Sequence, residues 1–179
     1  MAESIPASSA VGQKLNVLYE LTKSIRGALI DQAIWADVLV TDILAEFFVP
    51  DQKRRMLLLS DVLTGRDATF SGRCAVLEKV VASFYPAFHK QHAKLFDELS
   101  KIRRTRNRLA HAHLDTNDEF LSKDHTDRIQ LVFYEDGERK QQVITVEEFQ
   151  QRLKDGSGTT QVLVELLELI RSEATAVGR

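Results

Sequence analysis

Residues 11–49 read VGQKLNVLYELTKSIRGALIDQAIWADVLVTDILAEFFV, with no proline and only two glycines. Apolar residues recur there at steps of three and four, the period of an amphipathic helix with a broad apolar face. Gly27 is the expected kink, so the stretch predicts one very long helix or two nearly collinear ones, ended by Pro50. The apolar positions are Leu15, Leu18, Leu21, Ile25, Leu29, Ala33, Ala36, Val40, Ile43 and Phe47.

Three more helices are expected in the residues that follow. Asp51 can cap a short helix through Leu63, with Met56, Leu57 and Leu59 buried. A second helix is predicted over residues 69–84. Pro86 suits the first position of a third, which extends to about Ala112.

The chain then changes character. Residues 128–134 and 143–146 alternate apolar and polar side chains around Asp136-Gly137, a strong hairpin signal. Residues 145–148 form a capping box that opens a helix. Residues 156–158, Gly-Ser-Gly, are expected to break that helix before a last one over 160–173.

These patterns predict a mainly α fold, an up-and-down helical bundle with one small β-hairpin near the C-terminus. Residues 1–10 are expected to be disordered, and residues 11–179 to form a single domain. The hairpin module at about 128–146 and the two C-terminal helices would be an addition to the bundle.

Composition narrows the class of protein. The 179 residues are 44% hydrophobic and 28% charged, with a net charge of −2, so any nucleic-acid contact needs a local basic patch. The single cysteine, Cys74, excludes an internal disulfide and a thiolate zinc site. The N-terminus lacks the apolar run of a secretory signal, and no stretch approaches the length of a membrane span. We therefore predict a soluble, cytoplasmic protein without membrane association.

The stretch Arg106-Asn107-Arg108-Leu109-Ala110-His111 is the strongest candidate for chemistry. Five of the eight residues from Lys101 to Arg108 are basic. The ordinary explanation is a solvated helix end, where the helix dipole favours cations. The alternative is a phosphate-binding face, with Arg103, Arg104 and Arg108 as further nucleic-acid-binding residues.

Helical spacing permits this site without proving it. Arg106 and His111 are five residues apart, about 140° around an ideal helix, whereas Asn107 and His111 share a face. The Arg106 side chain is long enough to bend its guanidinium toward that face.

These residue types suit cleavage of RNA by its own 2′-hydroxyl. Histidine exchanges protons near neutral pH, and arginine is a bidentate phosphate ligand that stabilises charge on the phosphorane. Asparagine can orient either group, and no metal or cofactor is required. One histidine cannot easily be both acid and base in one step, but a two-fold dimer would bring a second copy of the motif.

Other candidates are weaker. His113 could supplement His111. His89 and His92 lie three apart on one helix face, but surface histidines are the simpler interpretation, and no metal site is predicted. Cys74 is expected to be a small buried hydrophobe, and Trp35 to lie in the core or a dimer interface.

The residues resemble the HEPN superfamily, whose hallmark is an arginine, then four to six residues, then a histidine, usually with a polar residue straight after the arginine. Residues 99–111, LSKIRRTRNRLAH, resemble the "IRKIRNxxAH" segment of mannitol-operon-repressor-like members. Two earlier pieces are similar to the same group: residues 31–34 leading to 44–48, and residues 68–73. The resemblance covers roughly residues 15–115.

This resemblance implies an up-and-down helical bundle that dimerises, with two motifs facing a shared cleft. In catalytic members the arginine and histidine cleave RNA without metal, which here implies catalytic roles for Arg106 and His111 and a supporting role for Asn107. The expected function is thus an endoribonuclease of toxin or defence type, with RNA and a separately encoded protein as partners. The mannitol-repressor-like branch implies an alternative: a non-catalytic helical regulator, for example of transcription, that binds a protein or nucleic acid. A third reading is structural, with Asn107 and His111 capping the helix end.

Overall fold

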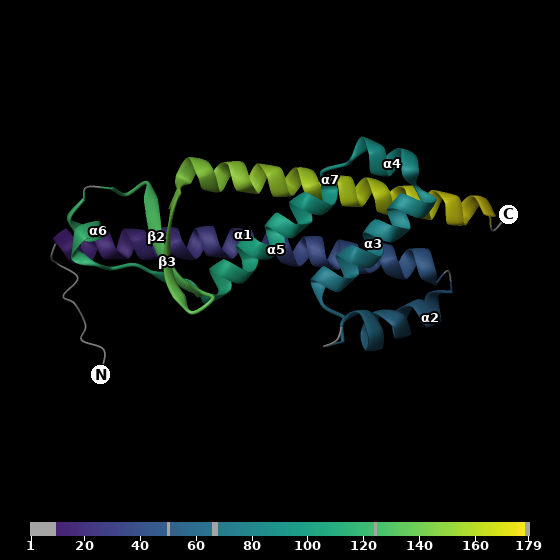
Figure 1. Ribbon diagram of the computed structural model, residues 1–179, viewed down its shortest axis with the longest axis horizontal. Helices are drawn as coiled ribbons and strands as arrows, with labels where there is room; N and C mark the ends of the chain where they lie inside the picture. Colours follow the sequence, from purple (N-terminus) through teal and green to yellow (C-terminus); the bar gives the residue numbers. More distant parts are fainter. Residues whose placement is uncertain (1–9, 50, 66–67, 124, 178–179) are drawn as a thin grey trace. The chain divides into compact units, whose positions relative to one another are not determined.

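The computed structural model describes residues 10–49, 51–65, 68–123 and 125–177, and it confirms a mainly α fold with a small antiparallel sheet near the C-terminus (Figure 1). Residues 1–9, most of the segment expected to be disordered, lie outside this range; Ala10 already belongs to a helix. The elements are α1 (Ala10–Phe48), α2 (Gln52–Leu57), the π-helix η1 (Leu58–Leu63), α3 (Phe70–Phe84), α4 (Pro86–Gln91), α5 (Leu95–His111), β1 (His113–Leu114), α6 (Asp118–Ser122), β2 (Arg128–Glu135), β3 (Glu138–Thr145) and α7 (Val146–Val177).

The chain forms two compact units, which are described one at a time. The sheet unit comprises Met1–Ile30 and Thr105–Leu153, and the helical unit comprises Asp31–Arg104 and Lys154–Arg179. Helices α1, α5 and α7 supply residues to both units. The single domain over residues 11–179 stays a prediction.

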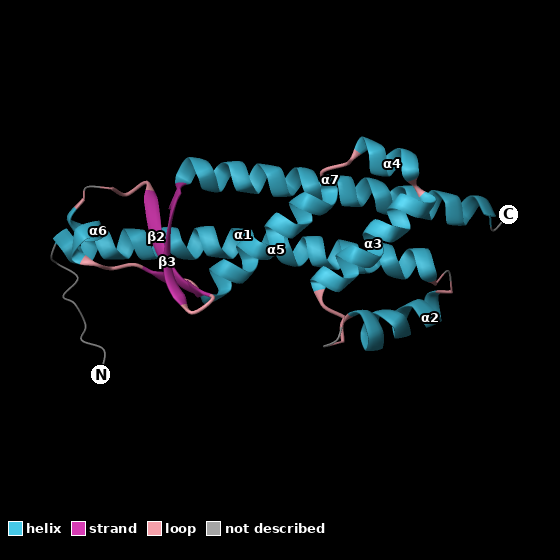
Figure 2. Cartoon of the chain, viewed as in Figure 1, coloured by secondary structure: helices cyan, strands magenta, loops and turns pink. Residues whose placement is uncertain are grey.

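The sheet unit contains a three-stranded antiparallel sheet in the order β1-β2-β3 (Figure 2, magenta). The predicted hairpin is confirmed: Asp136 and Gly137 have positive φ angles of 55° and 80°, as a tight turn between twisted strands requires. The capping box is confirmed too, because Thr145 Oγ1 accepts from the Glu148 N–H and Glu148 Oε2 from the Thr145 N–H, both at 3.2 Å. Strand β1 was not predicted.

The sheet buries one face against helices of its own unit. Ile129, Leu131, Phe133 and Ile144 alternate along β2 and β3 and are at most 7% exposed. They share a core with residues of α1 and of the end of α5, so the hairpin is an integral part of this unit's core. The helical partners in that core are Ile25, Leu29, Leu109 and Ala112.

The helical unit has its own apolar core, built from α1, α3, α5 and α7. The apolar period of residues 33–47 predicted its α1 face correctly, since Ala33, Ala36, Val40 and Ile43 are buried. The fully buried side chains with the largest volumes here are Ile43, Leu44, Leu77, Leu99, Leu163 and Leu166.

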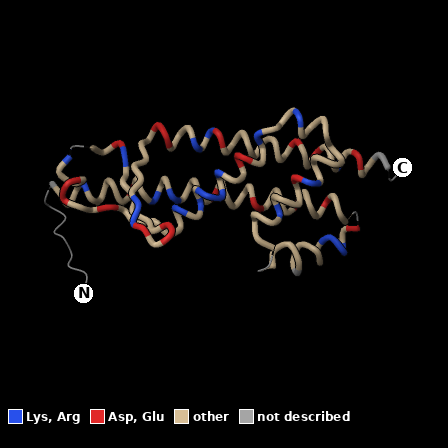
Figure 3. Tube along the Cα trace, viewed as in Figure 1, with Lys and Arg blue, Asp and Glu red and all other residues tan. Residues whose placement is uncertain are grey.

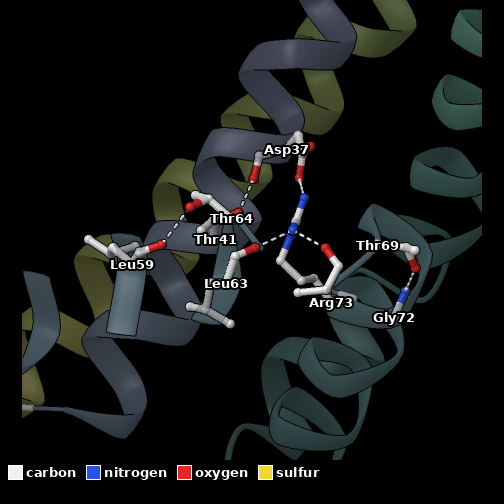
Figure 4. Close-up of polar contacts among 9 residues, drawn as sticks. Asp37, Thr41, Leu59, Leu63, Thr64, Thr69, Gly72 and Arg73 are labelled. Atoms are coloured by element: carbon white, nitrogen blue, oxygen red, sulfur yellow. Dashed lines mark hydrogen bonds and ion pairs between the residues drawn. The ribbon is translucent and has the colours of Figure 1, made fainter. Parts of the chain in front are cut away.

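Arg73 organises the polar contacts around the start of α3 (Figure 4). Its Nη1 donates to the backbone carbonyls of Leu63 and Ala68, and its Nη2 pairs with Asp37. Thr69 caps α3 by accepting from the Gly72 N–H at 3.1 Å. The guanidinium thereby satisfies carbonyls at the end of η1 and in the turn that follows, next to α1.

Two predicted helices differ from expectation. Met56 and Leu57, expected to be buried, are 61% and 60% exposed at the end of α2, a helix without a buried residue, and π geometry begins after them at Leu58. The helix predicted from Pro86 to about Ala112 is two helices, since His92 leaves helical geometry with φ −113° and ψ 44°. The ring of His92 packs on Phe88, with 4.4 Å between centroids.

The predicted break at Gly156-Ser157-Gly158 is wrong. One continuous helix, α7, replaces the two expected C-terminal helices. Thr159 and Thr160 return hydrogen bonds of 3.0 Å to the carbonyls of Asp155 and Gly156, and the residues that follow are anchored in the helical-unit core. Gly156 is buried where a Cβ would overlap the side chain of Gln32, so this glycine allows close approach to α1. Gly27, the expected kink, also lies inside one continuous helix, α1.

Candidate functional site

The motif occupies the last turns of α5, which ends at His111. Leu109 is 2% exposed and, with Ala112, anchors this helix end in the core of the sheet unit. Arg106, Asn107, Ala110 and His111 are all exposed. The buried positions thus fix the helix so that the polar members of the motif face solvent.

Arg106 bends toward Asn107. The Nη1 atom of Arg106 donates to Oδ1 of Asn107 at 3.1 Å. Asn107 and His111 are four residues apart and share a helix face, whereas Arg106 alone is about 140° from His111. The hydrogen bond therefore brings the guanidinium to the side of the helix that carries the histidine.

His111 is exposed, and among the described residues no hydrogen bond or ion pair involves its side chain. Its imidazole can meet a ligand without first breaking an internal contact.

Arg108 has structural partners within the sheet unit. Its Nη2 lies 3.4 Å from Oε1 of Glu135, and its guanidinium lies over the Phe133 ring, 5.6 Å from the centroid. These contacts join the end of α5 to the end of β2. Within the described part of the chain, Arg108 is the predicted nucleic-acid-binding residue that pairs with a carboxylate.

His113 is exposed on β1, directly opposite Val132 of β2. One buried residue, Ala112, and the change from helix to strand separate it from His111. The two histidines thus lie on consecutive elements, α5 and β1, of the same unit.

Arg103 and Arg104 belong to the helical unit. Arg104 is exposed, and Arg103 is half-buried close enough to Cys74 for its charge to lower the pKa of the thiol. Burial is the larger effect and, with the negative charge of Asp37, raises the pKa of Cys74 to about 12. Cys74 is therefore a protonated thiol at neutral pH, but it is half-buried and not buried as expected.

Asp115, just after β1, was missed as a structural centre of this region. Its side chain is 6% exposed, and Oδ2 accepts from Gln130 at 2.9 Å and from Gln141 at 2.8 Å. Oδ1 accepts from the Asn117 N–H at 3.2 Å, and Arg139 lies 3.5 Å from Oδ2. Burial alone would raise the pKa of Asp115, but these donors and the Arg139 charge outweigh it and lower the pKa. The carboxylate ties the segment after His113 to β2 and β3.

Figure 3 marks the basic residues along α5 and the acidic residues at the turn between β2 and β3. Lys140 lies 3.6 Å from Glu135 and 4.0 Å from Glu138, and Arg108 also pairs with Glu135. The acidic turn is thus largely paired with basic residues of its own unit. Arg106 does not take part in any of these ion pairs.

The remaining candidates show no chemical site. Among the described residues, no group of three or more His, Cys, Asp or Glu side chains could hold a metal ion. His92 lies 4.0 Å from Glu165, and the ring centroids of His89 and Phe96 are 6.1 Å apart. Trp35 is 58% exposed, so it does not lie in the core.

No family model, curated protein or solved structure matches the chain. In the part of the chain that the structure describes, no helix has both the length and the apolar character needed to cross a membrane.

Proposed function

We propose that this chain is a HEPN-like, metal-independent endoribonuclease of toxin or defence type that acts as a homodimer. The supporting observation is the hydrogen bond from Arg106 to Asn107, which brings a phosphate-binding guanidinium to the helix face of an exposed His111. A cytoplasmic setting and a separately encoded protein partner belong to the same proposal.

The chemistry is an internal phosphoryl transfer. The 2′-oxygen of a ribose loses its proton and bonds to the adjacent phosphorus, while the bond from phosphorus to the 5′-oxygen breaks and that oxygen gains a proton. The products are a 2′,3′-cyclic phosphate and a 5′-hydroxyl. His111 transfers one proton, and Arg106 stabilises the charge on the phosphorane oxygens.

The second proton transfer calls for a second group. In a two-fold dimer, the motif of the second copy supplies it, so each complete site is shared between two chains. Asn107 holds the Arg106 guanidinium in position through their hydrogen bond.

The test is RNA cleavage by purified protein in EDTA, with structured and unstructured substrates. His111→Ala is expected to lower the cleavage rate about 10²- to 10⁴-fold, the usual contribution of a general acid or base. Arg106→Ala should cause a comparable loss, and Asn107→Ala a smaller one. His89→Ala is the matched control, since it removes a histidine outside the motif and should leave the rate unchanged.

Equal cleavage by the His111→Ala and wild-type proteins on every substrate would reject the enzyme. One observation favours the alternative, a non-catalytic regulator: among the described residues, no carboxylate or carbonyl orients the imidazole of His111. On that alternative the protein binds nucleic acid or a protein and leaves RNA intact.

A further inference from the structure

The face of the sheet opposite its buried core is partly open to solvent. Tyr134 is 70% and Val143 is 43% exposed, and Arg139, Gln141 and His113 are also exposed. In antiparallel strands, residues that pair across the ladder share a face and alternate along each strand. By the observed register this outer face carries His113 of β1, Arg128, Gln130, Val132 and Tyr134 of β2, and Arg139, Gln141, Val143 and Thr145 of β3.

The glutamates of the hairpin strands lie on the face opposite the outer face. Glu135 and Glu138 lie opposite each other in the ladder and belong to the other face of the sheet. Arg108 and Lys140 contact them there. The carboxylate of Asp115 is also near the outer face, but it is buried and accepts hydrogen bonds from Gln130 and Gln141, with Arg139 beside it. Arg128 is held by its neighbour Asp127 at 2.9 Å, and Arg139 lies 3.5 Å from the buried carboxylate of Asp115 but keeps a side chain that is 51% exposed.

Tyr134 and Arg139 lie directly opposite each other in the ladder. An aromatic ring this exposed contributes little to the core of the unit, but it offers a flat surface for stacking. Unpaired bases stack on such rings regardless of sequence, and a neighbouring arginine contacts the phosphate or stacks in turn. The same strand pair thus presents both groups that a single strand requires.

We propose that the outer face binds single-stranded RNA, with a base stacked on Tyr134 and the backbone contacted by Arg139. The choice of RNA rests on the proposed function, although binding does not require cleavage. His113 joins this face through β1, and β1 follows the motif helix after one residue. The β1 edge of the outer face is therefore adjacent in the chain to the end of α5, which carries Arg106 and His111.

The exposed tyrosine is what favours RNA over an acidic peptide as the occupant. A peptide carboxylate would use Arg139 but would gain no stacking from Tyr134. A duplex is disfavoured as well, because its bases are already stacked on one another.

The test measures binding of a labelled single-stranded 12-mer RNA by fluorescence anisotropy, with every protein in a His111→Ala background to prevent cutting. Tyr134→Ala is expected to weaken binding about 5- to 150-fold, the range for loss of one stacked base. Tyr134→Phe keeps the ring and should bind like its parent. Tyr19→Ala is the matched control, because Tyr19 is another exposed tyrosine of the sheet unit, 55% exposed on α1. Arg139→Gln should weaken binding and reduce the slope of log affinity against log salt by about 0.7.

Equal RNA affinity of the Tyr134→Ala and parent proteins would overturn RNA binding by the outer face. So would an equal loss of affinity from Tyr134→Ala and Tyr19→Ala. So would tighter binding of a polyglutamate peptide or of the matching duplex than of the single strand. The nuclease assay on proteins with His111 intact separates the two proposals. RNA binding that depends on Tyr134, without any cleavage, rejects the enzyme and supports RNA binding by the outer face. Cleavage that does not depend on Tyr134 supports the enzyme and rejects RNA binding by the outer face.

Discussion

Asp115 carries a buried carboxylate that receives hydrogen bonds from two glutamine amides and one backbone N–H, with Arg139 beside it. Asp115→Asn replaces one acceptor oxygen by a donor that faces other donors. We expect the free energy of unfolding to fall by about 1–3 kcal/mol at pH 7, the usual cost of an unmatched buried polar group. Urea unfolding followed by circular dichroism measures it.

The pH dependence distinguishes this role from simple packing. The pKa of Asp115 is lowered from its ordinary value of 3.8, so the charged carboxylate stabilises the fold at every pH above that value. The contribution is lost as pH falls through the lowered pKa. The stability difference between wild type and Asp115→Asn should therefore be constant near neutrality and shrink below about pH 4. A difference that does not change down to pH 2 would contradict the charged role.

Cys74 should resist alkylation in the native protein. Burial raises the pKa of its thiol to about 12, and only the thiolate attacks iodoacetamide. At pH 8 we expect no modification by mass spectrometry in native buffer and complete modification in denaturing urea, with the single cysteine making the result unambiguous. Rapid native labelling would contradict the protonated state of this half-buried thiol.

At the residue scale, local spacing predicted part of the site. The shared face of Asn107 and His111 and the reach of Arg106 follow from helix geometry and side-chain length. The partners of Arg108 do not, because Glu135 is 27 residues away and meets it only after the hairpin packs on α5. Asp115 was missed for the same reason: its donors come from two strands whose pairing fixes the contact.

Helix α7 offers a prediction at the scale of the element. Gly158 lies in the middle of the helix, and a Cβ added there meets nothing within 4 Å. Gly158→Ala should therefore stabilise the protein by about 0.5–1 kcal/mol through helix propensity. Gly156→Ala brings the same propensity but must displace the Gln32 side chain, so its gain should be smaller or negative. Thermal unfolding of the two variants checks the order, and a larger gain from Gly156→Ala would contradict it.

Elements with a strong period were predictable, and their interruptions were not. The 39-residue helix α1 and the β2–β3 hairpin follow from apolar spacing and an Asp-Gly turn. The break at residues 92–94 contains neither proline nor glycine, whereas Gly156 and Gly158 stand inside a continuous helix. Packing of Leu95 and Leu99, and of Leu163 and Leu166, in the helical-unit core outweighs local propensity at both places.

At the scale of the whole molecule, the two units each have a core of their own. The motif, the histidine of β1 and the outer face of the sheet all belong to the sheet unit. Composition gave no sign of this grouping, since residues of α1 and α5 are divided between the units at Ile30 and Arg104 without any linker. A composite site between two copies is testable on the assembled protein.

Mixing two inactive variants provides that measurement. If each site takes Arg106 from one chain and His111 from the other, a dimer of Arg106→Ala with His111→Ala holds one intact site and one that lacks both groups. On that arrangement, cleavage returns to about half of the wild-type rate when the two variants are unfolded together and refolded as a mixture, because one of the two sites of the mixed dimer is complete. The hydrogen bond from Arg106 to Asn107 instead favours Arg106 and His111 of one chain acting together. We therefore expect both sites of the mixed dimer to lack a group and the mixture to stay inactive. The double variant Arg106→Ala/His111→Ala, refolded with wild type, is the control: its mixed dimer has no intact shared site, but keeps one intact site if both groups come from the same chain.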